Sequence, residues 1–136
     1  MQEKKHIAIL GSTGSIGTQA LDVIRSQREH FEVEVLSSFN NADLLISQSR
    51  EFLPNAVVIG DEKKLSIVRE ALSSLPVKVF AGEEALTQLV EIAEIDIVLT
   101  AMVGYAGLKP TLNAIRAGKQ IALANKETLV VAGELV

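Results

Sequence analysis

The sequence predicts an α/β fold with a doubly wound parallel sheet, Rossmann-like, in three α/β/α layers. Short apolar runs alternate along the chain with stretches of helical periodicity. The first apolar run, residues 6–10, ends directly at a glycine-rich turn over residues 11–17. The total of 136 residues is the size of one domain. Together these observations favour one nucleotide-binding type of domain.

The first half of the chain predicts three strand–helix pairs. Each pair is a short apolar run, followed after a turn by apolar residues at helical spacing, such as Ile16, Ala20 and Ile24. Apolar runs without alternation are typical of parallel strands that are covered on both faces. In chain order the pairs are 6–10 with 15–26, 33–37 with 42–52, and 56–59 with 61–73.

The second half continues the alternation. Glu83 and Glu84 suit the positive N-terminal end of a helix, and Gly118 is typical of the residue that ends one. The last segment, from residue 126 to residue 136, is expected to begin a helix. The pairs are 77–80 with 83–93, 95–100 with 108–117, and 120–123 with this last segment.

Composition excludes several classes of function. The chain has no cysteine, which excludes disulfides, cysteine-bound zinc and thiol nucleophiles. Its formal net charge of −4 disfavours nucleic-acid and anionic membrane partners. No apolar run approaches the roughly 18 residues of a membrane span. We therefore expect a soluble cytoplasmic domain without nucleic-acid or membrane contacts.

The glycine-rich turn predicts a dinucleotide site. In this motif the first glycine permits the turn, the middle one lets backbone approach a pyrophosphate, and the last one lets helix and strand pack closely. The helix that follows offers unpaired N–H groups to phosphates. The spacing of residues 11, 14 and 17 differs from the strict G-x-G-x-x-G pattern, and an ordinary strand-to-helix turn remains the alternative.

The end of the second predicted strand bears on the choice of cofactor. Folds that bind NAD place an acidic residue there, whereas this chain has Phe39, Asn40 and Asn41, and Asp43 is the first acid downstream. A carboxylate would repel a 2′-phosphate, and an amide can donate to it. The sequence therefore favours NADP(H) over NAD(H). The two asparagines also suit a turn and a helix cap, and the two roles are compatible.

Charge is distributed unevenly along the chain. Residues 1–96 carry 9 basic and 15 acidic side chains, a net of −6, and residues 97–136 carry 4 basic and 2 acidic ones, a net of +2. Lys126 follows the sixth predicted strand, where ligands bind in doubly wound sheets. This position would let Lys126 face an anionic substrate; a solvated lysine at a helix start is the alternative and the more common role for an isolated lysine.

Three segments together resemble one enzyme family. They are residues 11–17 (GSTGSIG), 101–111 (AMVGYAGLKPT) and 114–130 (AIRAGKQIALANKETLV). They are similar to the N-terminal, NADPH-binding domain of 1-deoxy-D-xylulose 5-phosphate reductoisomerases. The resemblance implies NADPH-dependent rearrangement and reduction of that phosphosugar to 2-C-methyl-D-erythritol 4-phosphate, in the non-mevalonate pathway of isoprene biosynthesis.

The resemblance also implies roles for particular residues. Lys126 corresponds to a substrate contact, and Ala101 and Met102 would border the nicotinamide side. The family often has a lysine in the loop after the second strand, where this chain has asparagine. The expected cofactor-binding residues are Thr13, Gly14, Ser15, Ile16, Phe39, Asn40, Asn41, Asn125 and Glu127.

The family's other catalytic parts are expected beyond residue 136. The resemblance implies a metal-requiring oxidoreductase, a homodimer that uses Mg²⁺ or Mn²⁺, with an Asp and two Glu as ligands. We expect no catalytic or metal-binding residue within residues 1–136, which we interpret as a truncated NADPH-binding domain, inactive alone. Two alternatives remain from the sequence: another NADP-linked oxidoreductase domain, or a nucleotide-sensing domain without chemistry.

Overall fold

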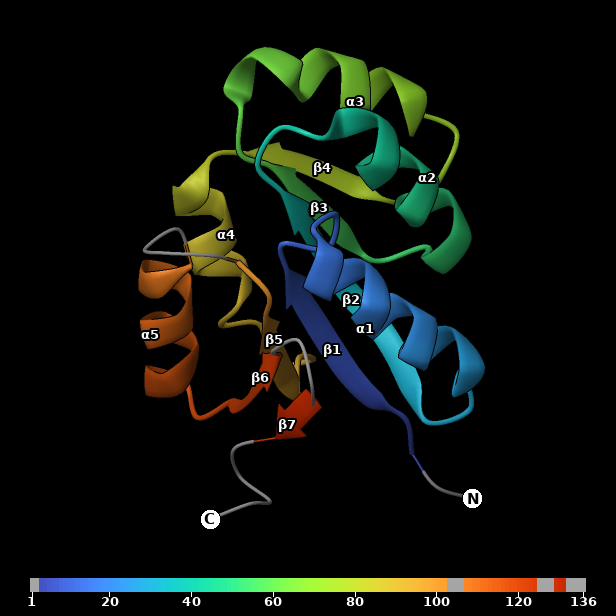
Figure 1. The fold of residues 1–136 in the computed structure, drawn as a ribbon. Helices are drawn as coiled ribbons and strands as arrows, with labels where there is room; N and C mark the ends of the chain where they lie inside the picture. The colour runs from blue at the N-terminus through green and yellow to red at the C-terminus, as the bar shows by residue number, and fades with distance from the viewer. Residues whose placement is uncertain (1–2, 103–106, 125–128, 132–136) are drawn as a thin grey trace.

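The computed structural model describes residues 3–102, 107–124 and 129–131. A single seven-stranded sheet runs through it, with helices on both sides (Figure 1). The strands are β1 (Lys5–Leu10), β2 (Phe31–Ser38), β3 (Ala56–Ile59), β4 (Lys78–Ala81), β5 (Ile97–Thr100), β6 (Gln120–Ala124) and β7 (Leu129–Val131). Six of them are parallel, as the sequence predicts.

The helices form the two outer layers. Ile7 and Ile9 of β1 belong to a core with α1, α2 and α3, and Ala8 and Leu10 belong to a second core with α4 and α5. This alternation follows from the two-residue period of a strand. The helices are α1 (Ser15–Ser26), α2 (Ala42–Phe52), α3 (Leu65–Ala71), α4 (Glu83–Leu89) and α5 (Leu108–Arg116), with a 3-10 turn η1 (Glu62–Lys64) before α3.

The strand order explains where a ligand can bind. The order across the sheet is β4-β3-β2-β1-β5-β6-β7, so the chain moves outward in one direction from β1 and then returns to add β5 on its other side. Ligands of doubly wound sheets bind outside the carboxyl ends of the strands where the order reverses. That point lies between β1 and β5, next to the glycine-rich turn.

Two predicted helices are shorter than their hydrophobic pattern suggests. The segment predicted as one helix over 61–73 consists of η1 and α3, because the side chain of Asp61 accepts a hydrogen bond from the N–H of Lys63 and starts a tight turn. The helix predicted over 83–93 ends at Leu89. Tight turns follow it, in which Ile92 donates to the carbonyl of Leu89 and Ile95 to that of Ile92.

The prediction of a helix over residues 126–136 is wrong where the structure describes this segment. Leu129–Val131 form β7, which pairs antiparallel with β6, with Leu123 opposite Val130. Two consecutive valines favour extended backbone, and β6 would otherwise present its unpaired backbone groups at the edge of the sheet. Within the described residues, no helix is long and apolar enough to cross a membrane.

Candidate functional site: the glycine-rich turn and the ends of β1 to β5

The three glycines after β1 have three different surroundings. Gly11 has a φ of +86°, and a Cβ on it would lie 2.9 Å from the Cγ of Met102 after β5. A Cβ on Gly17 would lie 2.1 Å from the carbonyl oxygen of Gly11, so helix α1 packs directly against the turn. Gly14 is exposed, and a Cβ there would have no atom closer than 4.0 Å. The backbone is therefore open to a ligand at Gly14, whereas it is tightly packed at Gly11 and Gly17.

The N-terminus of α1 is available to an anion. Gly14 is its N-cap residue and forms no side-chain cap, and the first turn carries no acidic side chain. The first N–H groups of a helix have no partner within the helix and carry a partial positive charge. Ser15 is exposed, and Thr13 and Ile16 are half-buried beside it. The four predicted phosphate contacts thus lie together at one helix end.

A buried glutamine of α2 forms two hydrogen bonds to the glycine-rich turn. Gln48 of α2 donates from Nε2 to the carbonyl of Ser12 at 2.9 Å, and its Oε1 accepts from the Ser12 hydroxyl at 2.7 Å. Both side chains are buried. Two hydrogen bonds between the same residues fix the position of the turn relative to α2, because a buried polar group is costly to leave unpaired.

The Ser38 hydroxyl joins the two predicted cofactor segments. It lies 2.7 Å from the hydroxyl of Thr13 and accepts from the N–H of Asn41 at 3.2 Å. Asn41 in turn caps α2 by accepting from the N–H of Leu44, which confirms its predicted cap role. The glycine-rich turn and the loop after β2 are therefore one hydrogen-bonded unit.

A pocket of about 230 Å³ opens at the carboxyl ends of β2, β3 and β4. Its walls combine apolar side chains with serine hydroxyls and glycine backbone, a lining that suits a flat, partly polar ring system. Phe39, one of the predicted cofactor residues, is 67% exposed at its rim. The lining residues are Ser37, Ser38, Phe39, Val58, Gly60, Gly82, Glu83, Leu86 and Met102.

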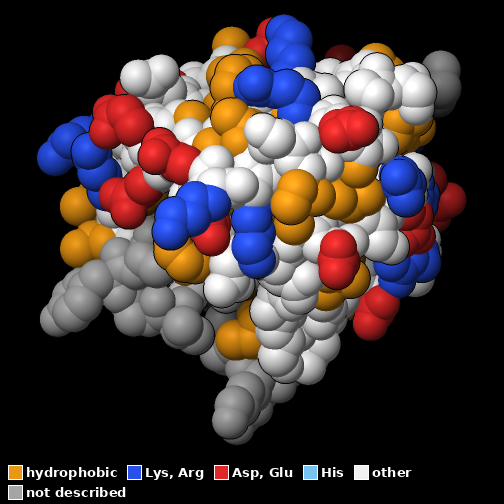
Figure 2. All heavy atoms as spheres, turned by 90° about the horizontal axis from the view of Figure 1, so that it is seen from above, with side chains coloured by type: hydrophobic (Ala, Val, Ile, Leu, Met, Phe, Trp, Pro, Cys, Tyr) orange, Lys and Arg blue, Asp and Glu red, His pale blue; other side chains and the backbone are white. Residues whose placement is uncertain are grey.

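A second, more open pocket lies at the loop after β2 and the start of α2. Among its described lining residues the basic side chain is Lys64, whose Nζ donates to the carbonyl of Asn40 at 2.6 Å. On the face that Figure 2 shows, acidic and basic side chains are interspersed with apolar ones, so individual donors rather than a broad field would select an anion. We call this the Asn40–Lys64 pocket; it is lined by Asn40, Asn41, Ala42, Asp43, Lys64 and Ile67.

The remaining predicted residues are described only in part. Met102 contacts the first pocket, and the N–H of Ala101 donates to the carbonyl of Leu10 at the end of β1. Both residues thus lie at the reversal of the strand order. Asn125, Lys126 and Glu127 lie outside the described residues.

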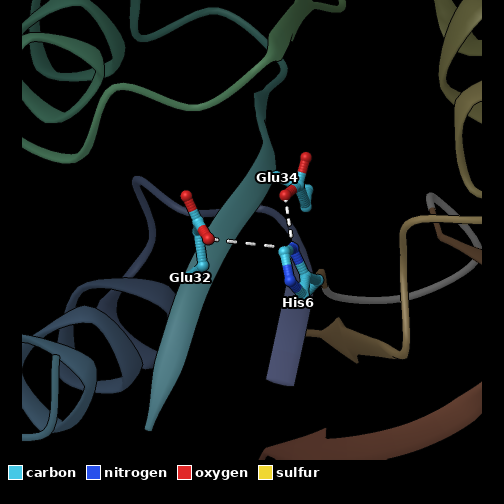
Figure 3. Close-up of side chains that lie close together, drawn as sticks. All are labelled: His6, Glu32 and Glu34. Atoms are coloured by element: carbon cyan, nitrogen blue, oxygen red, sulfur yellow. Dashed lines mark hydrogen bonds and ion pairs between the residues drawn. The ribbon is translucent and has the colours of Figure 1, made fainter. Parts of the chain in front are cut away.

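A separate cluster of ionisable side chains lies at the opposite, amino-terminal edge of the sheet. Glu34 occupies a bulge of β2 and is buried, and its Oε1 lies 2.6 Å from the Nδ1 of His6 (Figure 3). Its Oε2 accepts from the side chain of Asn55. Glu32 lies 4.0 Å from the same histidine nitrogen. The pKa of His6 is raised, chiefly by its hydrogen bond to Glu34. These contacts join the starts of β1, β2 and β3, far from the glycine-rich turn.

Sequence reasoning missed Gln48 and Lys64. A signal was present for Gln48, because a glutamine on the inner face of a helix is buried only with partners. Lys64 gave no signal. It is 24 residues from Asn40 in sequence, and only the fold brings the two together.

Comparison with known proteins identifies the family. Residues 7–133 match the model of the 1-deoxy-D-xylulose 5-phosphate reductoisomerase family. The enzyme of that name from Bacteroides fragilis is 69% identical over 134 residues, which is 98% of this chain and 34% of the relative. The one from Caldanaerobacter subterraneus is 52% identical over 97% of this chain and 34% of the relative. The chain thus spans about a third of the length of these relatives.

Solved structures agree with the sequence match. The Zymomonas mobilis reductoisomerase in complex with NADPH superimposes with a TM-score of 0.85 at 36% identity, covering 92% of this chain and 33% of that one. A biliverdin reductase with NADP⁺, at 19% identity and a TM-score of 0.50, shares the fold alone. The alternatives of a different oxidoreductase or a sensor therefore lose their support. The fold, the glycine-rich turn and the match over residues 7–133 place this chain in the 1-deoxy-D-xylulose 5-phosphate reductoisomerase family.

Proposed function

We propose that this chain is the NADPH-binding part of an enzyme that rearranges and reduces 1-deoxy-D-xylulose 5-phosphate to 2-C-methyl-D-erythritol 4-phosphate. The observation that carries the proposal is the open backbone at Gly14, at the uncapped N-terminus of α1 and beside the reversal of the strand order. A pyrophosphate needs such an approach to backbone N–H groups. Membership of the family and the similarity to a reductoisomerase solved with NADPH support it.

The described residues fit a dinucleotide. Thr13, Gly14, Ser15 and Ile16 would hold the pyrophosphate at the start of α1. The pocket beside Phe39 would take the adenosine end, because its apolar walls and serine hydroxyls match a flat ring and a ribose. Ala101 and Met102 would border the nicotinamide end.

NADPH, when bound, supplies the hydride that reduces the rearranged aldehyde. The part of this chain is to bind and orient. Gln48 and Ser38 fix the turn and the β2 loop before the cofactor arrives, so that less ordering is needed on binding. Asn125 and Glu127 complete the cofactor contacts, and Lys126 contacts the phosphosugar, as the resemblance implies.

We place the divalent metal, Mg²⁺ or Mn²⁺, on residues outside 1–136. A related reductoisomerase has been solved with magnesium, and another structure holds NADPH, fosmidomycin and magnesium together. The three-residue cluster that the described part of the chain offers to a cation, at His6, lies at the edge of the sheet away from the nucleotide pocket. The complete enzyme is proposed to be a cytoplasmic homodimer.

Titration of the complete protein with NADPH and NADH, followed by nicotinamide fluorescence, tests the cofactor assignment. We expect saturable binding with a clear preference for NADPH, because the β2 loop offers amides and no carboxylate before Asp43. Tighter binding of NADH would refute the NADPH assignment. Turnover of 1-deoxy-D-xylulose 5-phosphate with NADPH and Mg²⁺ tests the reaction itself.

A further inference from the structure

The loop after β2 lacks a basic side chain of its own, although the proposed cofactor carries a phosphate there. Residues 37–43 contain two serines, two asparagines and Asp43, and no lysine or arginine. An amide alone is a weak partner for a phosphate dianion, and a neighbouring cation ordinarily accommodates a 2′-phosphate. The structure brings such a cation from another element.

Backbone hydrogen bonds fix the position of Lys64 next to this loop. The N–H of Gly60 donates to the carbonyl of Ser38 at 2.8 Å, and the N–H of Asp61 donates to the carbonyl of Phe39 at 2.7 Å. The N–H of Lys64 then donates to the carbonyl of Asp61 at 3.0 Å. The start of η1 is thereby fastened to the β2 loop, and Lys64 is carried to it.

The side chain of Lys64 ends at the loop. Its Nζ donates to the carbonyl of Asn40 at 2.6 Å, and the half-buried residue lines the Asn40–Lys64 pocket. An ammonium has three donors, and this contact uses one. Among the carboxylates that the structure describes, none forms an ion pair with Lys64. Two donors and a full charge therefore remain for a ligand.

The surroundings suit a phosphate on a ribose. Asn41 uses its Oδ1 to cap α2, so its amide N–H groups stay available as donors. Asn40 lines the Asn40–Lys64 pocket, and Phe39, the residue before it, lines the pocket that would hold the adenosine end. Asp43 also lines the Asn40–Lys64 pocket and is exposed, so an anion bound here needs a cation to offset that carboxylate.

We propose that Lys64, together with the amides of Asn40 and Asn41, binds the 2′-phosphate of NADPH and determines the preference for NADPH over NADH. This inference rests on the proposed function, because it assigns a residue to one end of the proposed cofactor. It assigns cofactor choice to a lysine of η1, on the neighbouring crossover, instead of to the β2 loop alone.

The test compares nucleotide affinities in the complete protein. Lys64→Met keeps the length of the side chain and removes its charge; Lys63→Met is the matched control, since Lys63 is exposed on the same turn and lines neither pocket. We expect Lys64→Met to weaken NADPH binding by about tenfold or more, the range of a lost charge-assisted hydrogen bond. NADH binding should stay unchanged, and Lys64→Arg should retain most of the preference.

Adenosine 2′,5′-bisphosphate and adenosine 5′-monophosphate, used as competitors, isolate the 2′-phosphate from the nicotinamide end. Only the bisphosphate should lose affinity in Lys64→Met. Equal losses for both compounds, or equal losses in Lys63→Met and Lys64→Met, would overturn the inference. An unchanged preference for NADPH over NADH in Lys64→Met would also overturn the inference. That result would leave the proposed function intact. A wild-type protein that binds neither nucleotide would contradict the proposed function itself.

Discussion

Some residues at the proposed site stabilise the fold, whereas others are exposed and open to a ligand. Gly17 is closed in by the backbone of the turn, whereas Gly14 faces open space. Ser12 and Gln48 are buried and form hydrogen bonds to each other, whereas Ser15 and Asn40 are exposed. The two groups should therefore respond differently to substitution: the buried one through stability, and the exposed one through binding.

Substitution of two glycines separates these effects. We expect Gly17→Ala to lower the free energy of unfolding by about 2 kcal/mol or more, because the added methyl group meets backbone that cannot move aside. Gly14→Ala should cost less than about 1 kcal/mol, since it meets no atom, yet it should weaken NADPH binding by blocking the approach of the pyrophosphate. Urea unfolding and NADPH titration measure the two quantities. A Gly14→Ala protein with wild-type affinity would show that the cofactor does not approach this backbone.

Gln48 is expected to support the turn in the absence of any ligand. Gln48→Leu removes both hydrogen bonds to Ser12. The Ser12 hydroxyl can still donate to the carbonyl of Ser37, but the Ser12 carbonyl loses its buried partner, which costs about 1–3 kcal/mol. NADPH affinity should fall with it, as the turn loses its fixed position. Gln19→Leu, on the exposed face of α1, is the control and should change neither the urea midpoint nor the affinity. Equal urea midpoints for Gln48→Leu and wild type would refute this role of Gln48.

Among the secondary-structure elements, the carboxyl ends and the amino ends of the strands carry different features. The carboxyl ends of the strands carry the open turn and both pockets. The amino ends are joined by the contact of Glu34 with His6 (Figure 3) and by its contact with Asn55. The backbone N–H of His6 also donates to Asp96 before β5, at 2.9 Å. The amino-terminal contacts join four strands, and their residues line neither of the two pockets.

The His6–Glu34 pair predicts a dependence of stability on pH. Because the pKa of His6 is raised in the folded protein by Glu34, and also by Glu32 and Asp96, folding favours the protonated ring. Its stabilisation is complete below the unfolded-state pKa of about 6.5 and is lost as the pH rises through the higher folded-state value. The ring is about a third exposed, so the change should not exceed about 1 kcal/mol.

The measurement is the free energy of unfolding between about pH 6 and pH 8.5, the range in which histidine titrates. His6→Gln should remove most of the decline that wild type shows over this range. His30→Gln is the matched control, since that ring is exposed and pairs only with the exposed Glu29 among the described residues. A titration of the His6 ring protons by NMR gives the pKa directly; a value at or below 6.5 would refute the assignment.

At the scale of the whole molecule, the described groups of the proposed site that can donate to an anion lie on one side of the sheet. Its described ligand-facing residues gather at one edge of the sheet, where backbone N–H groups, hydroxyls and Lys64 are donors to anions. Relatives about three times as long carry the family name, and a related structure holds NADPH, fosmidomycin and magnesium together. Under the proposed function, this chain would bind the nucleotide, and conversion of the phosphosugar would need the remainder of the longer enzyme.

We expect the 136-residue chain by itself to bind NADPH and to show no turnover. Under the proposed function the metal ligands lie outside residues 1–136, and without them a bound nicotinamide has no positioned aldehyde to reduce. The assay follows NADPH absorbance with 1-deoxy-D-xylulose 5-phosphate and Mg²⁺, after circular dichroism has established that the chain is folded. The complete protein is the positive control. Measurable oxidation of NADPH by the short chain would show that residues 1–136 contain a catalytic centre.

Local sequence patterns are enough to predict the α/β class, the parallel strands and the position of the glycine-rich turn. These features depend on local patterns: apolar runs such as Val57 to Ile59, helical spacing, and glycines at fixed intervals. Strand β7 and the contacts among distant residues depend instead on how the whole chain folds. A free edge on β6 overrode the local prediction for residues 129–131. Gln48 meets Ser12, and Lys64 meets Asn40, because parallel strands bring together the loops at their ends, and no local pattern encodes those pairs.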